Sequence, residues 1–338
     1  MAESDAQGAP LPTKHQPGLD GLRALAIAGV IGFHYMRSDV PGGSLGVDIF
    51  FVLSGWLITS LLIREADRTG RIDYGAFLTR RFLRLTPPLA AVLAAYVLLA
   101  PVFIPKAAPG RWIDAAWTAA YLTNIRETFW PRNTPLSHTW FLALQGQFYL
   151  AWPLIFMGLR KLTRTRAAVA LVGLWLVLTL ARAAWHYTLG GPAPYYFTPL
   201  HATGLLLGAA FALRPVEMPW RWAGWAALAL LVGLILFGRT SANFLYLQPI
   251  MEWVTLVVIA RPPALLALQP LPFIGAISYG IYLWHVPFMW VYPPKTWAAR
   301  GGLVVASLFA GWLTHLLLEK PFAKARARPE PASDAPNP

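Results

Sequence analysis

The sequence predicts an all-α membrane protein, a polytopic bundle of about ten transmembrane helices with both termini in the cytoplasm. Composition is the first observation: 57% of the 338 residues are hydrophobic, 13% are charged and the mean hydropathy is +0.49. An ordinary soluble domain carries about 25% charged residues. The second observation is the length of the apolar runs, and the third is the uneven distribution of lysine and arginine between alternate loops.

The apolar runs define the predicted helices. Crossing a hydrocarbon core of about 30 Å takes about 20 mainly apolar residues in a helix. The run at 85–104 meets this length without a charged residue, whereas 200–213 is short and 243–260 carries Glu252. In chain order, we expect helices at 20–36, 45–63, 85–104, 139–159, 167–187, 200–213, 222–238, 243–260, 271–292 and 302–318.

Lysine and arginine set the predicted orientation, because cytoplasmic loops carry an excess of them. With the N-terminus inside, 18 fall on the cytoplasmic side and 8 on the outer side. An even number of crossings then leaves both termini inside. We therefore expect a cytoplasmic segment at 1–18, one transmembrane domain at 19–322 and a disordered cytoplasmic tail at 323–338.

The net charge of +13 is mainly this topology signal, and it makes anionic membrane lipids the expected partner. The basic residues are scattered over many loops and no nucleic-acid-binding motif is present, so no nucleic acid is expected. The chain has no cysteine, which excludes disulfides, a thiol nucleophile and cysteine-ligated metals. We expect no metal site.

Charged residues inside the first predicted helix are candidates for function. An ionisable side chain in a spanning segment costs roughly 2.5 to 3.5 kcal/mol on insertion scales. Arg23 and His34 are eleven residues apart, which places them about 20° apart on one helix face and about 16 Å apart along its axis. Both could line one polar channel. Arg23 could instead form an interfacial pair with Asp20 at the helix end.

Other polar residues lie near the two ends of that channel. Asp48 begins the second predicted helix on the outer side, where it could meet His34 and orient its ring, or cap its own helix. Arg81 and Arg84 directly precede the third predicted helix and could bind phosphates through forked hydrogen bonds. They would serve equally well as cytoplasmic anchors.

Five sequence blocks together resemble the acyltransferase-3 family of integral-membrane O-acyltransferases, the type that includes bacterial O-antigen acetylases. Arg23 and His34 match the R-x10-H motif of that family, and Arg81 and Arg84 match its R-x-x-R motif. The blocks occur in family order between residues 19 and 322. They are GLRALAIAGVIGFH, GVDIFFVLSGWLIT, RRFLR, HTWFLALQGQFYLAWPL, and ISYGIYLWHVPF followed by LEKPF.

The resemblance implies ten helices in the bacterial inner membrane, a cytoplasmic acyl-CoA donor, with acetyl-CoA preferred, and a hydroxyl acceptor on an extracytoplasmic carbohydrate. Some members add an extracytoplasmic domain, which we do not expect here because the chain ends soon after its last predicted helix. The expected roles are general base for His34, orientation of its ring for Asp48, donor binding for Arg23, Arg81 and Arg84, and secondary roles for Gln145, His138, Tyr279 and His285.

One block departs from the family pattern. Members commonly read SLSVEEQFYL where residues 141–150 read FLALQGQFYL, so Gln145 and Gly146 replace two glutamates. Gln145 keeps the reach of glutamate but cannot exchange a proton. A catalytically impaired homologue therefore stays open as an alternative. A transporter or flippase is a second alternative, because such a protein would also place charges inside a helical bundle.

Overall fold

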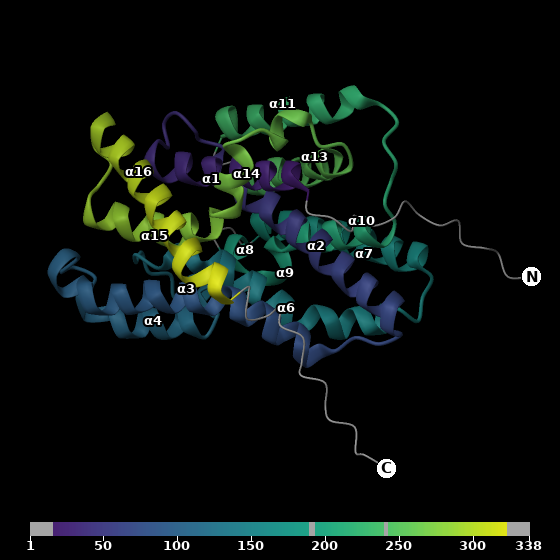
Figure 1. Cartoon of the computed structure of the whole chain (residues 1–338), viewed down its shortest axis with the longest axis horizontal. Coiled ribbons are helices and arrows are strands. Elements are labelled where there is room, and N and C mark those ends of the chain that lie inside the picture. Colours follow the sequence, from purple (N-terminus) through teal and green to yellow (C-terminus); the bar gives the residue numbers. More distant parts are fainter. Residues whose placement is uncertain (1–15, 189–192, 240–242, 323–338) are drawn as a thin grey trace, which may run out of the picture.

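The computed structural model describes residues 16–188, 193–239 and 243–322, and within these ranges every regular element is a helix (Figure 1). The all-α prediction is confirmed. The first fifteen residues of the predicted segment 1–18, and the whole of the predicted tail 323–338, lie outside the described residues. The number of membrane crossings and the cytoplasmic position of both termini stay predictions.

Five of the described helices are long and apolar enough to cross a membrane. They are α2 (Gly46–Thr69), which follows the short η1 (Gly43–Leu45), α3 (Tyr74–Phe103), α6 (Trp140–Leu159), which follows η3 (Ser137–Thr139), α7 (Arg164–Thr188), and α16 (Trp297–Thr314), which continues into η6 (His315–Glu319).

The remaining helices are shorter or carry more polar residues. The apolar ones are α10 (Thr203–Leu213), α11 (Arg221–Phe237), and α13 (Gln248–Ala260) after η4 (Asn243–Leu247). The others are α1 (Pro17–Tyr35), η2 (Ala108–Gly110), α4 (Arg111–Ala119), α5 (Thr123–Phe129), α8 (Ala193–Tyr196), α9 (Thr198–His201), η5 (Ala264–Ala267), α14 (Leu271–Ala276) and α15 (Ser278–Val291).

Helix α3 begins eleven residues earlier than the predicted helix at 85–104, at Tyr74. The Asp73 side chain caps it by accepting a 2.8 Å hydrogen bond from the backbone N–H of Ala76, which satisfies one of the free donors of the first turn. Arg81 and Arg84 therefore lie inside α3 instead of before it. Their side chains face other helices from a rigid element.

Three predicted helices are broken into two pieces. Residues 198–213 form α9 and α10, residues 243–260 form η4 and α13, and Ile277 separates α14 from α15. The segment between α3 and α6, where no helix is predicted, contains α4 and α5. Both are too short to show a clear apolar period, and their buried polar side chains mask the pattern that would reveal them.

Helix α2 runs through the centre of the bundle, between α1, α11 and α13 on one side and α3 and α6 on the other (Figure 1). Its apolar window is 78% buried, against 28% for α7 and 22% for α16, whose outer faces remain for lipid. Helices α2 and α10 approach through glycines. A Cβ atom built on Gly55 would lie 2.0 Å from Leu205 O, and one built on Gly208 would lie 2.1 Å from Val52 O. Small residues of this kind permit close contact between helices in membranes.

We expect Gly208→Val to lower the stability of the protein in detergent by about 1 to 3 kcal/mol, the usual range for overpacking, because its side chain collides with the α2 backbone. Gly173→Val is the matched control, since a Cβ at Gly173 meets nothing within 4 Å. Thermal unfolding followed by fluorescence-detected size exclusion measures both. Equal unfolding temperatures for the two variants would contradict the close α2–α10 contact.

Candidate functional site

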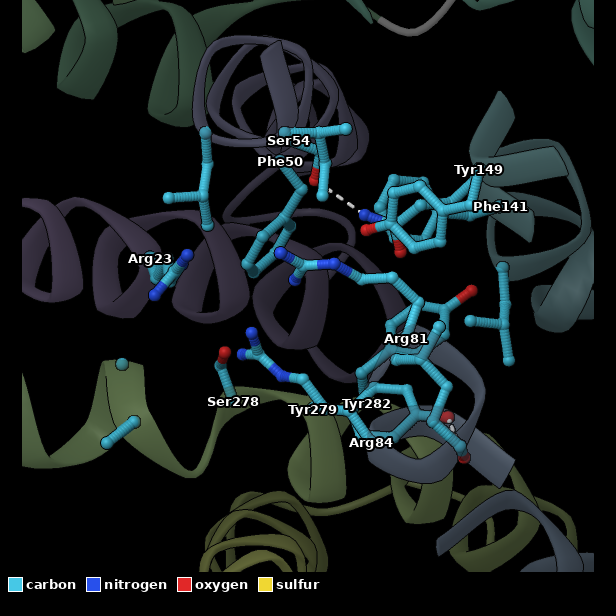
Figure 2. A pocket seen from close by; sticks show the side chains of 17 residues that line it. Arg23, Phe50, Ser54, Arg81, Arg84, Phe141, Tyr149, Ser278, Tyr279 and Tyr282 are labelled. Carbon is cyan, nitrogen blue, oxygen red and sulfur yellow. Dashed lines mark hydrogen bonds between the residues drawn. The ribbon is translucent and has the colours of Figure 1, made fainter. Parts of the chain in front are cut away.

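A pocket open to solvent, with about 800 Å³ of space when the solvent at its mouth is included, lies between α1, α2, α3, α6, α14 and α15. Figure 2 shows the side chains of Arg81 and Arg84 reaching from α3 toward Arg23 on α1. Helices far apart in the sequence thus bring five of the predicted site residues to one pocket. These residues are Arg23, Arg81, Arg84, Gln145 and Tyr279.

The pocket is strongly positive at the arginine end. Three guanidinium groups line it, and no carboxylate is among the lining residues. Arg23 Nη1 lies 2.7 Å from Asp20 Oδ1 at the edge of the pocket, as the interfacial-pair alternative anticipates, yet Arg23 also faces the pocket. Such a group of guanidinium forks suits phosphate oxygens.

Part of the pocket lining is aromatic. Phe50 lies near the start of α2, Phe141 lies near the start of α6 and Tyr282 belongs to α15. Ring centroids are 6.0 Å apart for Phe50 and Phe141 and 5.5 Å apart for Phe141 and Tyr282. We call these three residues the aromatic wall.

Gln145 joins two of the helices around this pocket, which we call the arginine pocket after Arg23, Arg81 and Arg84. Its Nε2 donates a 2.5 Å hydrogen bond to Ser54 Oγ on α2. The amide therefore joins α6 to α2 while its side chain lines the pocket. A glutamate at this position would accept a hydrogen bond from the serine hydroxyl and bring a negative charge to the arginine pocket.

His34, His138 and His285 form a cluster, the histidine cluster, beyond the aromatic wall. The ring centroids of His34 and His285 are 4.8 Å apart, and those of His138 and His285 are 5.1 Å apart. None of the three lines the pocket. His138 and His285 are buried, whereas His34, in the last turn of α1, is partly exposed.

Hydrogen bonds indicate which nitrogen of His34 is the base. Val30 O accepts at 2.9 Å from His34 Nδ1, and Tyr282 O accepts at 2.6 Å from His285 Nδ1. A carbonyl only accepts, so both Nδ1 atoms carry the proton. His285 Nε2, which is then unprotonated, lies 3.3 Å from His34 Nδ1. His34 Nε2 keeps its lone pair and can take a proton.

Tyr282 stands between the pocket and the histidine cluster. Its side chain lines the pocket, while its hydroxyl donates a hydrogen bond to the backbone carbonyl of His138. Its ring centroid lies 5.2 Å from that of His138 and 5.6 Å from that of His285. In the sequence, the signal for Tyr282 is its place three residues before His285.

Asp48 pairs with His201 in the structure, and its expected role toward His34 stays a prediction. Its Oδ1 lies 3.3 Å from His201 Nε2, and no hydrogen bond joins it to His34. His201 Nδ1 in turn lies 2.5 Å from Tyr195 O. Asp48 is only 2% exposed and His201 1%, so this pair is internal to the bundle. Val30 O and His285 contact the His34 ring.

A buried polar network extends from this pair. Gln248 accepts a 2.8 Å hydrogen bond from Arg182 Nη1 and donates one of 2.9 Å to Glu252 Oε1. Glu252 also accepts from Thr203 and from Trp175, both at 2.6 Å. The amide of Gln248 thus links the arginine to the carboxylate and ties α7, α10 and α13 together.

The position of Gly146 is filled by a neighbouring ring. A Cβ atom on Gly146 would lie 2.5 Å from Tyr121 Cδ1. Tyr121 follows α4 in the left-handed region, with φ of 57°. A glutamate at residue 146 would therefore require this ring to move.

The histidine cluster has no arrangement suited to a metal. Within residues 16–188, 193–239 and 243–322, no group of three or more His, Cys, Asp or Glu side chains is placed to hold a metal ion. His138 has both ring nitrogens buried without a hydrogen-bond partner. The cluster is a group of three imidazole rings in contact.

Comparisons with known proteins agree with the sequence blocks. The chain is 33% identical over 311 residues to the O-acetyltransferase OatA of Staphylococcus aureus, which covers 82% of this chain and 51% of that protein. It is 31% identical over 353 residues to the peptidoglycan O-acetyltransferase OatA of Listeria monocytogenes, covering 92% of this chain and 56% of that protein. The chain thus spans about half the length of these curated relatives.

No solved structure is significantly similar to this chain. The model of the acyltransferase domain family, Acyl_transf_3, matches residues 16–317. This range contains the arginine pocket, the aromatic wall and the histidine cluster. The match covers most of the sequence, and the chain belongs to the acyltransferase-3 family.

Proposed function

We propose that this protein transfers an acyl group, preferably acetyl, from acyl-CoA in the arginine pocket to a hydroxyl of an extracytoplasmic carbohydrate. One observation carries the proposal. Tyr282 lines the pocket that holds three guanidinium groups, and its ring contacts His285, which in turn contacts His34. The residues proposed to bind the anionic donor and the residue proposed as the base thus lie on opposite sides of Tyr282.

The arginine pocket fits the donor. Coenzyme A carries a pyrophosphate and a ribose phosphate, and planar guanidinium groups bind phosphate oxygens through paired hydrogen bonds. Arg81 and Arg84 lie near the start of α3 and Arg23 near the start of α1. With the N-terminus in the cytoplasm, these ends face the cytoplasm, where acyl-CoA is made. The pantetheine arm would then point toward the aromatic wall.

His34 would act as the general base. Its Nε2 takes the proton of the acceptor hydroxyl as that oxygen attacks the thioester carbonyl. The carbon–sulfur bond then breaks, and the proton passes from His34 to the departing thiolate, which leaves as CoA–SH. The hydrogen bond from Nδ1 to Val30 O fixes the ring and its tautomer throughout.

The relatives narrow the acceptor. Proteins named O-acetyltransferase and peptidoglycan O-acetyltransferase share about a third of their matched residues with this chain. We therefore propose an envelope glycan of the peptidoglycan type as acceptor and the inner membrane as location. Family membership disfavours the transporter alternative, because a transporter would not need the arginine and histidine motifs of an acyltransferase.

We expect Arg81→Gln and Arg84→Gln each to weaken binding of acetyl-CoA by at least tenfold. A hydrogen bond to a charged group contributes about 1.5 to 3 kcal/mol. Arg80→Gln is the matched control, since Arg80 belongs to the same helix but pairs with Glu65 at 3.2 Å outside the pocket. Calorimetry on the purified protein in detergent measures all three. A loss with Arg80→Gln equal to the others would disfavour the pocket as the donor site.

We expect His34→Gln to reduce acyl transfer by about 10² to 10⁴-fold, the usual contribution of a general base, while acetyl-CoA binding changes less than twofold. His186→Gln on the exposed side of α7 serves as the control. Release of CoA thiol in the presence of soluble peptidoglycan fragments measures turnover. Full activity in His34→Gln would contradict the assignment of His34 as the general base.

Gln145→Glu tests the impaired-homologue alternative. We expect it to weaken acetyl-CoA binding several-fold, because a carboxylate at this position would compete with phosphate for the guanidinium groups. Gln145→Leu, which removes the hydrogen bond to Ser54 without adding charge, is the comparison. If wild type binds acetyl-CoA without turnover and Gln145→Glu restores transfer, the natural chain is impaired at this residue.

A further inference from the structure

On the side of the histidine cluster, the pocket is lined by tightly packed aromatic side chains. Phe141 is 6% exposed and Tyr282 is 5% exposed. Their rings are in contact, and Phe141 also packs on Phe51 with centroids 4.6 Å apart. Phe50, the third member of the aromatic wall, is only partly buried. Phe141 and Tyr282 therefore form the tightly packed part of the aromatic wall.

Tyr282 is held from both sides. Its hydroxyl donates to His138 O, and its own carbonyl accepts from His285 Nδ1 at 2.6 Å. Tyr35, whose hydroxyl donates to His285 O at 2.7 Å and contacts Ser307 Oγ at 2.9 Å, fixes the next turn of the same helix. Moving the Tyr282 ring breaks a buried hydrogen bond and disturbs the histidine cluster.

Tyr282 is also the member of the aromatic wall that contacts both the pocket and the histidine cluster. Phe50 and Phe141 line the pocket and contact other rings, but only Tyr282 combines a place in the pocket lining with ring contacts to His138 and His285. The Tyr282 ring therefore lies between the acyl group of a donor bound in the arginine pocket and the histidine cluster.

We propose that Tyr282, supported by Phe141, is the specificity-determining residue that limits the acyl group to a short chain. The inference rests on the proposed function. A thioester carbonyl must approach His34 at the edge of the Tyr282 ring, so the rest of the acyl group has to fit against the ring itself. Acetyl adds one methyl group there, whereas a longer chain has to displace a packed and hydrogen-bonded side chain.

The test compares binding of acetyl-, butyryl- and hexanoyl-CoA to the full chain in detergent, without acceptor, and then transfer to soluble peptidoglycan fragments. We expect wild type to bind hexanoyl-CoA at least tenfold more weakly than acetyl-CoA. In Tyr282→Ala the two affinities should differ by less than threefold, and transfer of hexanoyl should rise by at least tenfold relative to acetyl. Tyr282→Phe keeps the ring and should keep the preference.

Tyr279→Ala is the matched control. Tyr279 lines the same pocket one turn earlier, and its hydroxyl donates to Leu85 O at 2.8 Å near the arginines. This variant should change the affinity for all three thioesters by the same factor. If Tyr282→Ala does not fold, Phe141→Leu opens the same wall from the opposite helix and should favour butyryl-CoA.

The outcomes separate the two proposals. A folded Tyr282→Ala that keeps the tenfold preference, or a wild type that binds all three thioesters equally, overturns the size limit and leaves acyl transfer standing. A folded wild type that binds no thioester overturns the proposed function, and the size limit with it. A relaxed preference in Tyr282→Ala but not in Tyr279→Ala supports the assignment.

Discussion

The interior of this bundle offers little water, so burying a polar side chain there is costly unless the side chain finds a partner in the protein. The Arg126 guanidinium, 3% exposed, shows the constraint plainly. It lies 2.7 Å from Asp114 Oδ1 and also pairs with Glu127. These contacts tie α4 to α5, and Tyr96 on α3 donates to Asp114 as well. Charge pairing thus fixes the short helices between α3 and α6 where apolar packing alone would be weak.

The same constraint separates two kinds of polar group in the bundle. In the network around Gln248, amide, carboxylate and hydroxyl groups satisfy one another, and their exposure is close to zero. That network holds helices together. By contrast, three arginines face empty space in a pocket and His34 is partly exposed. Polar groups that line a pocket can contact a ligand there, which is why the proposed chemistry is assigned to them.

Packed side chains separate the arginine pocket from the histidine cluster. An enzyme that draws its donor from one side of a membrane and its acceptor from the other has to bring two substrates together without opening a channel for water or ions. Tyr282 and Phe141 fill the space between the pocket and the histidine cluster. In the proposed reaction only the acyl group passes this level, and the coenzyme stays on its own side. Exclusion of water there also protects the thioester from hydrolysis.

The sequence by itself determined the membrane class, the helical fold and the motif residues, because hydropathy and fixed spacings are local properties of the chain. It also predicted that Arg23, Arg81 and Arg84 share a role, and the structure brings them to one pocket. Only the tertiary structure decided the partners: Asp48 contacts His201 and not His34, while His34 contacts His285, 251 residues away. Such contacts depend on how broken helices pack and rotate against one another. The spacing of residues in the sequence does not specify that rotation. The place of Tyr282 between the arginine pocket and the histidine cluster is therefore visible only in the fold.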